Sequence, residues 1–255
     1  MKFIEPALNQ STGYCGLMPV ELHFGNQIQP GQVLPGRFTI GICRLMPDFM
    51  AQKKAGESIH IQMNRDDNKI VVLNTLHHKM EAVNINANLY DTDLKILWTK
   101  SNILDLISNG NTLTNWVVPV ENKLCFLKLT ALSKEGKLLS ENFYWLHGKN
   151  DFTSLANLPK SVIAGNVKIT KSNGRTYYEV NVKNTGKSLA FMVALKLQGK
   201  ESNQEILPSL WSDNYLNLLP GESKTVYLNV NDKDLTESTV IEAKAYNMPT
   251  SVILK

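Results

Sequence analysis

The feature that most constrains the fold is a series of short runs in which apolar and polar residues alternate, each bounded by turn residues. In residues 225–230 (TVYLNV), branched apolar residues alternate with Thr, Tyr and Asn, shortly after the turn residues Pro220 and Gly221. A period of two places successive side chains on opposite faces of a strand, so one face is buried and the other meets water. Repeated runs of this kind predict an all-β fold of antiparallel sheets.

Two arrays of such runs divide the chain. Residues 58–147 contain about seven runs with turn residues between them, which is the spacing expected of an immunoglobulin-like β-sandwich. A polar linker at 148–160 leads to a second array over 161–255. Residues 1–57 are interrupted by prolines and glycines and show no regular period. The sequence therefore predicts two consecutive immunoglobulin-like β-sandwiches, preceded by an irregular N-terminal segment.

Composition excludes several classes of partner. The chain has 43% hydrophobic and 20% charged residues and a formal net charge of +4, which is typical of a globular domain. Its Lys and Arg residues are scattered along strand patterns rather than gathered in a basic stripe, so no nucleic-acid partner is predicted. No apolar run is long enough to span a bilayer, and no membrane partner is predicted.

Cysteines and histidines give no sign of a metal or cofactor site. The three cysteines are too far apart for a disulfide framework or a metal knuckle, and Cys125, in an apolar run, is predicted to be buried. His60, His77 and His78 lack the spacing and the carboxylate or thiolate company of metal ligands. We therefore expect these histidines to lie on the surface, and we expect no metal and no cofactor.

An unusual cluster precedes the Pro220 turn: Trp211, Asp213, Asn214 and Tyr215. Aromatic faces with carboxyl and amide groups are suited to holding pyranose rings, so these four residues are candidates for a sugar-proximal site. Alternatively, Trp211 and Tyr215 pack in an interdomain seam while Asp213 and Asn214 form an Asx-type turn. Both interpretations stay open, and no residue of the chain is predicted to be catalytic.

The other tryptophans lie in strand patterns. Trp98, Trp116 and Trp145 are each predicted to anchor a sandwich core rather than to form a sugar platform. For Trp145, the alternation with Phe143 predicts that both side chains point into the core of the first sandwich.

Five segments follow one another in a distinctive order along the chain. They are 49–62 (FMAQKKAGESIHIQ), 83–93 (VNINANLYDTD), 140–146 (SENFYWL), 152–159 (FTSLANLP) and 207–215 (LPSLWSDNY). These segments resemble landmarks in the C-terminal part of glycoside hydrolase family 2, in its exo-β-glucosaminidase and β-mannosidase branch. In that family the landmarks mark the exit from a catalytic barrel and the immunoglobulin-like domains downstream of it.

The resemblance implies that the parent hydrolyses carbohydrate and that these sandwiches support its catalytic barrel, present in cis or as a separate chain. A retaining glycosidase needs two carboxyl groups held across the scissile bond, which barrel enzymes place at strand ends. The chain has no repeated strand–helix pattern, so we expect it to be inactive alone and to expose an apolar patch where the barrel docks.

The alternative is an independent carbohydrate-binding or adhesive module, with an oligosaccharide as its partner. Such a module needs a row of exposed aromatic side chains, and among the candidates the sequence offers only Trp211 and Tyr215. The sugar specificity of the parent is left open. The first ten residues lack the apolar core of a signal peptide, and a periplasmic or secreted parent is left open as well.

Overall fold

The computed structural model describes Met50 and residues 53–254. Most of the predicted irregular segment, residues 1–49, lies outside the described residues. Of its last part, Met50 and residues 53–55 are helical. The all-β prediction is confirmed: the chain forms four antiparallel sheets that make two sandwiches. None of the helices in the described part of the chain is long and apolar enough to cross a membrane.

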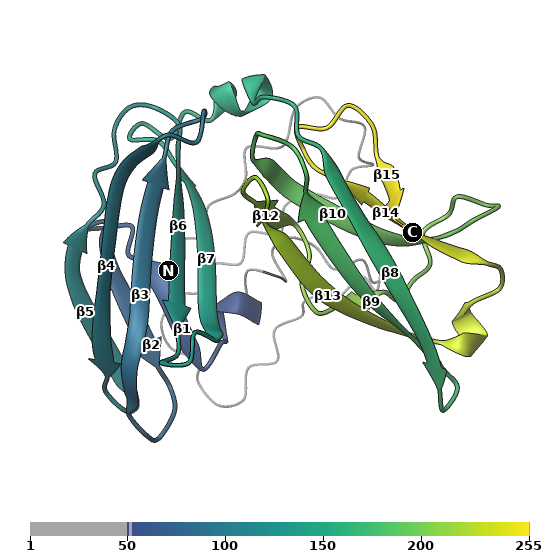
Figure 1. Cartoon of the computed structure of the whole chain (residues 1–255), viewed down its shortest axis with the longest axis horizontal. Helices are drawn as coiled ribbons and strands as arrows, with labels where there is room; N and C mark the ends of the chain where they lie inside the picture. Colours follow the sequence, from purple (N-terminus) through teal and green to yellow (C-terminus); the bar gives the residue numbers. More distant parts are fainter. Residues whose placement is uncertain (1–49, 51–52, 255) are drawn as a thin grey trace, which may run out of the picture. The chain divides into compact units, whose positions relative to one another are not determined.

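The first sandwich packs a three-stranded sheet, in the order β1-β2-β5, against a four-stranded sheet, in the order β4-β3-β6-β7 (Figure 1). Consecutive strands pair as hairpins at β1–β2, β3–β4 and β6–β7. The strands are β1 (Ile59–Met63), β2 (Lys69–Asn74), β3 (Met80–Tyr90), β4 (Ile96–Leu106), β5 (Gly110–Val117), β6 (Cys125–Leu132) and β7 (Leu138–Leu146).

The core of this sandwich is built by the alternation seen in the sequence. In β3, every second residue from Val83 to Leu89 is buried, and in β6 the same holds from Cys125 to Ala131. Trp98 and Trp116 pack against this core, as predicted. Cys125 is also buried in it, and burial raises the pKa of its thiol to about 11.

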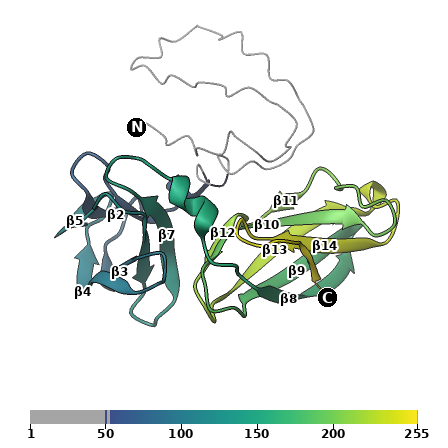
Figure 2. The ribbon, with the colours of Figure 1, turned by 90° about the horizontal axis from the view of Figure 1, so that it is seen from above.

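The second sandwich packs two four-stranded sheets, in the orders β12-β10-β14-β15 and β11-β13-β9-β8 (Figure 1). A short 3₁₀ helix, η1 (Thr153–Asn157), lies between β7 and β8 along the chain, and a second one, η2 (Asp232–Asp234), follows β13 (Figure 2). The strands are β8 (Ile163–Ser172), β9 (Arg175–Asn184), β10 (Ala190–Gly199), β11 (Leu210–Trp211), β12 (Leu216–Leu218), β13 (Ser223–Asn231), β14 (Thr239–Lys244) and β15 (Val252–Leu254).

The strands β1–β7 fall within residues 58–147 and the strands β8–β15 within 161–255. The domain boundaries themselves stay a prediction. Both sandwiches belong to one compact unit of the chain.

The histidine prediction is confirmed in part. His77 and His78 are exposed in the turn after β2. The prediction that His60 lies on the surface is wrong, because only 6% of this residue is exposed. His60 is the second residue of β1, and its Nδ1 lies 3.7 Å from Oε2 of Glu57, at the end of the preceding helical turn. Glu57 therefore covers part of His60, whereas the spacing of histidines in the sequence alone predicts that this side chain is exposed.

Candidate functional site

Trp211, the first of the predicted site residues, lies in the core of the second sandwich. It is the last residue of the two-residue strand β11 and pairs with Leu228 of β13. Only 4% of Trp211 is exposed, and it belongs to the same buried cluster as Leu195 and Leu216. In this position the indole acts as a packing element between the two sheets.

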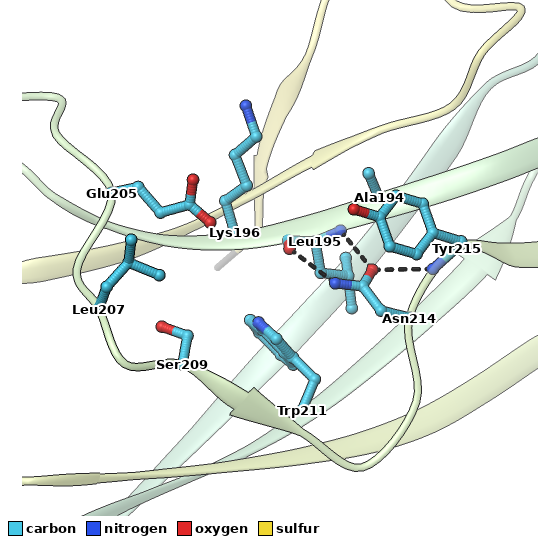
Figure 3. A pocket seen from close by; sticks show the side chains of 9 residues that line it. All are labelled: Ala194, Leu195, Lys196, Glu205, Leu207, Ser209, Trp211, Asn214 and Tyr215. Atoms are coloured by element: carbon cyan, nitrogen blue, oxygen red, sulfur yellow. Dashed lines mark hydrogen bonds between the residues drawn. The ribbon is translucent and has the colours of Figure 1, made fainter. Parts of the chain in front are cut away.

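Asn214 ties the loop after β11 to the middle of β10. Its side-chain Oδ1 accepts a hydrogen bond from the backbone N–H of Leu195 (2.8 Å), and its Nδ2 donates to the carbonyl of Leu195 (3.0 Å) (Figure 3). Oδ1 also accepts from the N–H of Tyr215 (2.9 Å). The side chain thereby satisfies two buried backbone groups of β10 that would otherwise need a neighbouring strand.

Tyr215 follows with a φ of 57°, in the left-handed region that non-glycine residues seldom adopt. It packs, partly buried, against the core of the second sandwich, and it lines the same small hollow as Asn214 (Figure 3). Together with Asn214, Tyr215 turns the chain from β11 into β12.

The hollow bordered by these residues is small. It has a volume of about 10 Å³, which is the room that one water molecule needs. A pyranose ring does not fit into it. The role of Trp211, Asp213, Asn214 and Tyr215 in a sugar site or in an interdomain seam stays a prediction. Lining residues are Ala194, Leu195, Lys196, Glu205, Leu207, Ser209, Trp211, Asn214 and Tyr215 (Figure 3).

Asp213 belongs to a chain of ion pairs that links the two sandwiches. Its carboxylate lies 2.8 Å from Nζ of Lys224 on β13. Lys224 also lies 3.2 Å from Glu141 on β7 of the first sandwich. Glu141 in turn lies 3.3 Å from Lys128 on β6, and Lys128 contacts Glu222 of the second sandwich. We call these five residues the interdomain ion network.

The network changes the proton affinities of its members. Burial raises the pKa of Glu141, but the ammonium groups of Lys224 and Lys128 outweigh this effect and hold the pKa below its usual range. Burial lowers the pKa of Lys224, but the carboxylates of Asp213 and Glu141 outweigh it and raise the pKa. Both shifts favour the charged forms, so at neutral pH the ion pairs are intact.

The network predicts a dependence of stability on pH. Because the pKa of Glu141 is lower in the folded state, its contribution is complete above the unfolded value of about 4.3 and is lost as the pH falls through the folded value. We expect Lys224→Met to reduce the free energy of unfolding at pH 7 by about 2 kcal/mol, less than the loss of a fully buried pair because these side chains are partly exposed. The measurement is urea unfolding between pH 3 and pH 7.

The same series supplies the control. Lys79→Met removes an exposed ion pair with Glu81, and we expect no measurable change in the pH profile. If Lys224→Met also leaves the profile unchanged, the interdomain ion network does not stabilise the fold.

An aromatic cluster lies beside the ion network and also joins the two sandwiches. Phe191 of β10, 3% exposed, lies with its ring centroid 5.8 Å from that of Phe126 and 5.3 Å from that of Trp145, both from the first sandwich. Tyr246 contacts the Phe191 ring edge-on from the second sandwich at 5.9 Å. We call the cluster around Phe191 the aromatic seam.

The prediction that Trp145 and Phe143 point into the core of the first sandwich is wrong. Both pack in the cluster around Phe126 and Phe191, on the outer face of their sheet. Tyr144, between them in sequence, packs against the first core instead, and its hydroxyl accepts a hydrogen bond from the N–H of Met63 (3.2 Å). One face of β7 is covered by the core of the first sandwich and the other by the cluster around Phe191, so both faces carry aromatic residues. Alternation alone therefore could not show which face points into the core.

A known protein family matches the C-terminal part of the chain. Residues 142–248 match the family described as the exo-β-D-glucosaminidase Ig-fold domain. The match begins within β7 and extends through β14. Residues 142–248 are therefore similar to this domain family.

Two curated relatives match a longer part of the chain than residues 142–248, so the similarity also reaches the first sandwich. The chain is 28% identical over 217 residues to the exo-β-D-glucosaminidase of Amycolatopsis orientalis, which covers 74% of this chain and 21% of the relative. It is 26% identical over 215 residues to that of Streptomyces avermitilis, which covers 73% and 24%. The chain therefore spans about a quarter of the length of these relatives.

Solved structures share the fold over both sandwiches. The crystal structure of the Amycolatopsis orientalis exo-chitosanase CsxA superimposes with a TM-score of 0.73 at 24% identity, over 80% of this chain and 27% of that one. A β-D-mannosidase from Dictyoglomus thermophilum gives 0.58 at 19% identity, over 83% and 24%. The resemblance to the glucosaminidase and mannosidase branch is thus confirmed.

Proposed function

We propose that the two sandwiches form the non-catalytic C-terminal part of an exo-β-glucosaminidase-type glycosidase. Their role is to support a catalytic barrel, joined to them in the same chain or supplied by a separate one, that performs the hydrolysis. The observation that carries this proposal is the similarity to an exo-β-D-glucosaminidase over 217 aligned residues, which covers 74% of this chain and therefore more than either sandwich alone. The glucosaminide rather than mannoside assignment is favoured because the curated relatives at hand carry the former name.

The joint between the sandwiches supports this role. Phe126, Trp145 and Phe191 bury apolar surface across it, and Glu141 and Lys224 add a charged contact beside them. Apolar packing combined with paired charges fixes the relative orientation of two domains more firmly than a flexible linker does. A rigid two-domain support is what a large barrel domain requires of its neighbours.

An exposed apolar edge on the first sandwich supports a docking role. Strands β4 and β5 each lie at the end of a sheet in the described part of the chain, and a short turn joins them. Ile103 on β4 is 65% exposed and Leu113 on β5 is 58% exposed. Ile103 pairs with Asn84 on the outer face of one sheet. Leu113 pairs with Val71 on the outer face of the other, so the two exposed residues flank this edge from opposite sides. Edge strands with large exposed apolar side chains are prone to aggregate unless another element covers them. Other exposed apolar residues of this edge are Ile96, Leu97, Ile107 and Val117.

The proposal is tested in a chimera. The matching C-terminal quarter of the Amycolatopsis orientalis exo-β-D-glucosaminidase is replaced by the two sandwiches of this chain, and hydrolysis of p-nitrophenyl β-D-glucosaminide is measured. We expect the full 255-residue chain alone to be inactive and the chimera to recover activity that the truncated enzyme lacks. We expect the double substitution Ile103→Lys and Leu113→Lys to lower the recovered activity by about tenfold, because lysine opposes burial of this edge.

Ile253→Lys is the matched control, since Ile253 is an exposed apolar residue of β15 in the other sandwich. It should leave the activity of the chimera unchanged. A folded chimera that is no more active than the truncated enzyme would argue against the supporting role. Equal losses for the edge and the control substitutions would argue against docking at β4 and β5.

A further inference from the structure

One face of the second sandwich presents two exposed tyrosines. In the sheet β11-β13-β9-β8, Tyr177 of β9 is 41% exposed and Tyr227 of β13 is 55% exposed. Their neighbours in sequence, Tyr178 and Leu228, are buried in the core. Because side chains alternate along a strand, both exposed tyrosines stand on the outer face of this sheet.

The strand register places the two rings close together. Tyr227 pairs with Glu179, and Tyr177 pairs with Asn229, so the tyrosines are diagonal neighbours on adjacent strands. Diagonal positions of this kind are about 7–8 Å apart, within reach of aromatic side chains. The two tyrosines therefore stand close enough on one sheet face for their rings to serve together as a platform for neighbouring sugar rings of a chain.

Polar groups border much of the platform, and the exposed Leu210 of β11 borders it in the row of Asn229. On the β8 side, Thr170 pairs with Tyr177. On the next row, Asn181 donates a hydrogen bond to Oγ1 of Thr225 (3.1 Å), and Oγ of Ser212 accepts one from the N–H of Tyr227 (2.8 Å). A pyranose has the matching character, with apolar C–H faces and a rim of hydroxyl groups. Tyrosine suits such a ligand because it combines an apolar ring with a polar end.

Charge beside the platform narrows the class of sugar. Glu179 is exposed and lies directly across from Tyr227, on the same face. A carboxylate at this place can form a charge-assisted hydrogen bond with the ammonium group of an amino sugar. Lys168 of β8 pairs with Glu179 from the strand on its other side. Its positive charge partly balances the carboxylate, so this part of the face is not strongly acidic.

The geometry points to a binding site for a β-linked glucosamine chain on the outer face of the sheet β11-β13-β9-β8. Tyr177 and Tyr227 stack on successive sugar rings, and Glu179 contacts an amino group. The choice of glucosamine rests on the proposed function, whereas the tyrosine platform does not.

The test uses the full 255-residue chain and isothermal titration with a glucosamine hexamer and with cellohexaose. We expect saturable binding of the glucosamine hexamer, weakened about tenfold or more by the double substitution Tyr177→Ala and Tyr227→Ala. We expect Glu179→Gln to weaken binding of the glucosamine hexamer while leaving cellohexaose unchanged. Ile253→Ala on β15 is the control and should bind like the unaltered chain.

Several results would overturn the inference. These are no saturable binding of either hexamer, equal binding by the double variant, or self-association of the chain that the tyrosine substitutions abolish, which would make the face a protein contact. Should the double variant lose its native circular dichroism, Tyr227→Ser alone decides, since this residue is the more exposed of the two. The chimera is assayed with a monosaccharide glycoside, which does not need a polymer-binding site. Absence of hexamer binding would therefore leave the test of the supporting role unaffected.

Discussion

Phe191→Ala is expected to uncouple the two sandwiches and to reduce the free energy of unfolding by about 3–5 kcal/mol, the usual loss for a buried phenylalanine. The ring contacts Phe126 and Trp145 of one sandwich and Tyr246 of the other, so its removal opens a cavity in the aromatic seam itself. Each aromatic pair contributes about 0.5–1.5 kcal/mol beyond its buried area. The measurement is scanning calorimetry of the full chain.

The form of the transition distinguishes uncoupling from general damage. With an intact seam the sandwiches should unfold together, and with Phe191→Ala they should unfold in two steps. Phe191→Leu keeps an apolar side chain, so its unfolding transition should be intermediate between those of the unaltered chain and Phe191→Ala. Tyr227→Ala removes an exposed aromatic residue of the same sandwich and should leave one transition. A single transition at an unchanged temperature for Phe191→Ala would show that the seam does not couple the domains.

The fold could be predicted from the sequence because a strand with one buried face and one solvent-exposed face shows apolar and polar residues in alternation. The runs that contain Val83 and Val226 show this period, and each forms a strand with one buried face. Turn residues between the runs, such as Pro220 and Gly221, mark where each strand ends. The resemblance to a known family was readable for a related reason, since its landmarks lie in strands and turns that the fold requires.

The joint between the sandwiches could not be predicted, because it depends on which strands have both faces covered. Phe143 and Trp145 show the same alternation whether they point into a core or into a neighbouring domain. The only sequence signal for the charged part was a lysine among apolar residues, as at Lys128 in β6. An isolated charge in such a run is as readily assigned to solvent, and only the fold brings Lys224 to Glu141.

The tyrosine platform was missed for a similar reason. Tyr177 and Tyr178 are adjacent, and the sequence does not state which of them faces water. That choice is set by the pairing of β9 with β13, which puts Tyr177 opposite Asn229 and Tyr178 opposite Leu228. A one-residue slip would exchange the two tyrosines, so register, which is a tertiary property, decides the binding face.

Trp211→Ala is expected to reduce the free energy of unfolding by about 3–5 kcal/mol, because it removes the largest side chain from between the two sheets of the second sandwich. The indole is 4% exposed and stands on β11, a strand of two residues held by its pairing with β13. Without it, β11 loses its buried side chain, and the loop that carries Asp213 stays tied to β10 by the hydrogen bonds of Asn214. The measurement is urea unfolding followed by circular dichroism.

The same substitution separates packing from sugar binding at this segment. If Trp211 serves the core, Trp211→Phe should restore more than half of the lost stability, since a second aromatic ring refills most of the space. A residue that serves a sugar site would behave in the opposite way: Trp211→Ala would leave the unfolding curve unchanged and abolish binding of the glucosamine hexamer. Tyr227→Ala should show that second pattern, because its ring is exposed on the outer face of the same sheet. Comparing Trp211→Ala with Tyr227→Ala therefore tests whether the Trp211 segment or the outer face with Tyr227 binds carbohydrate.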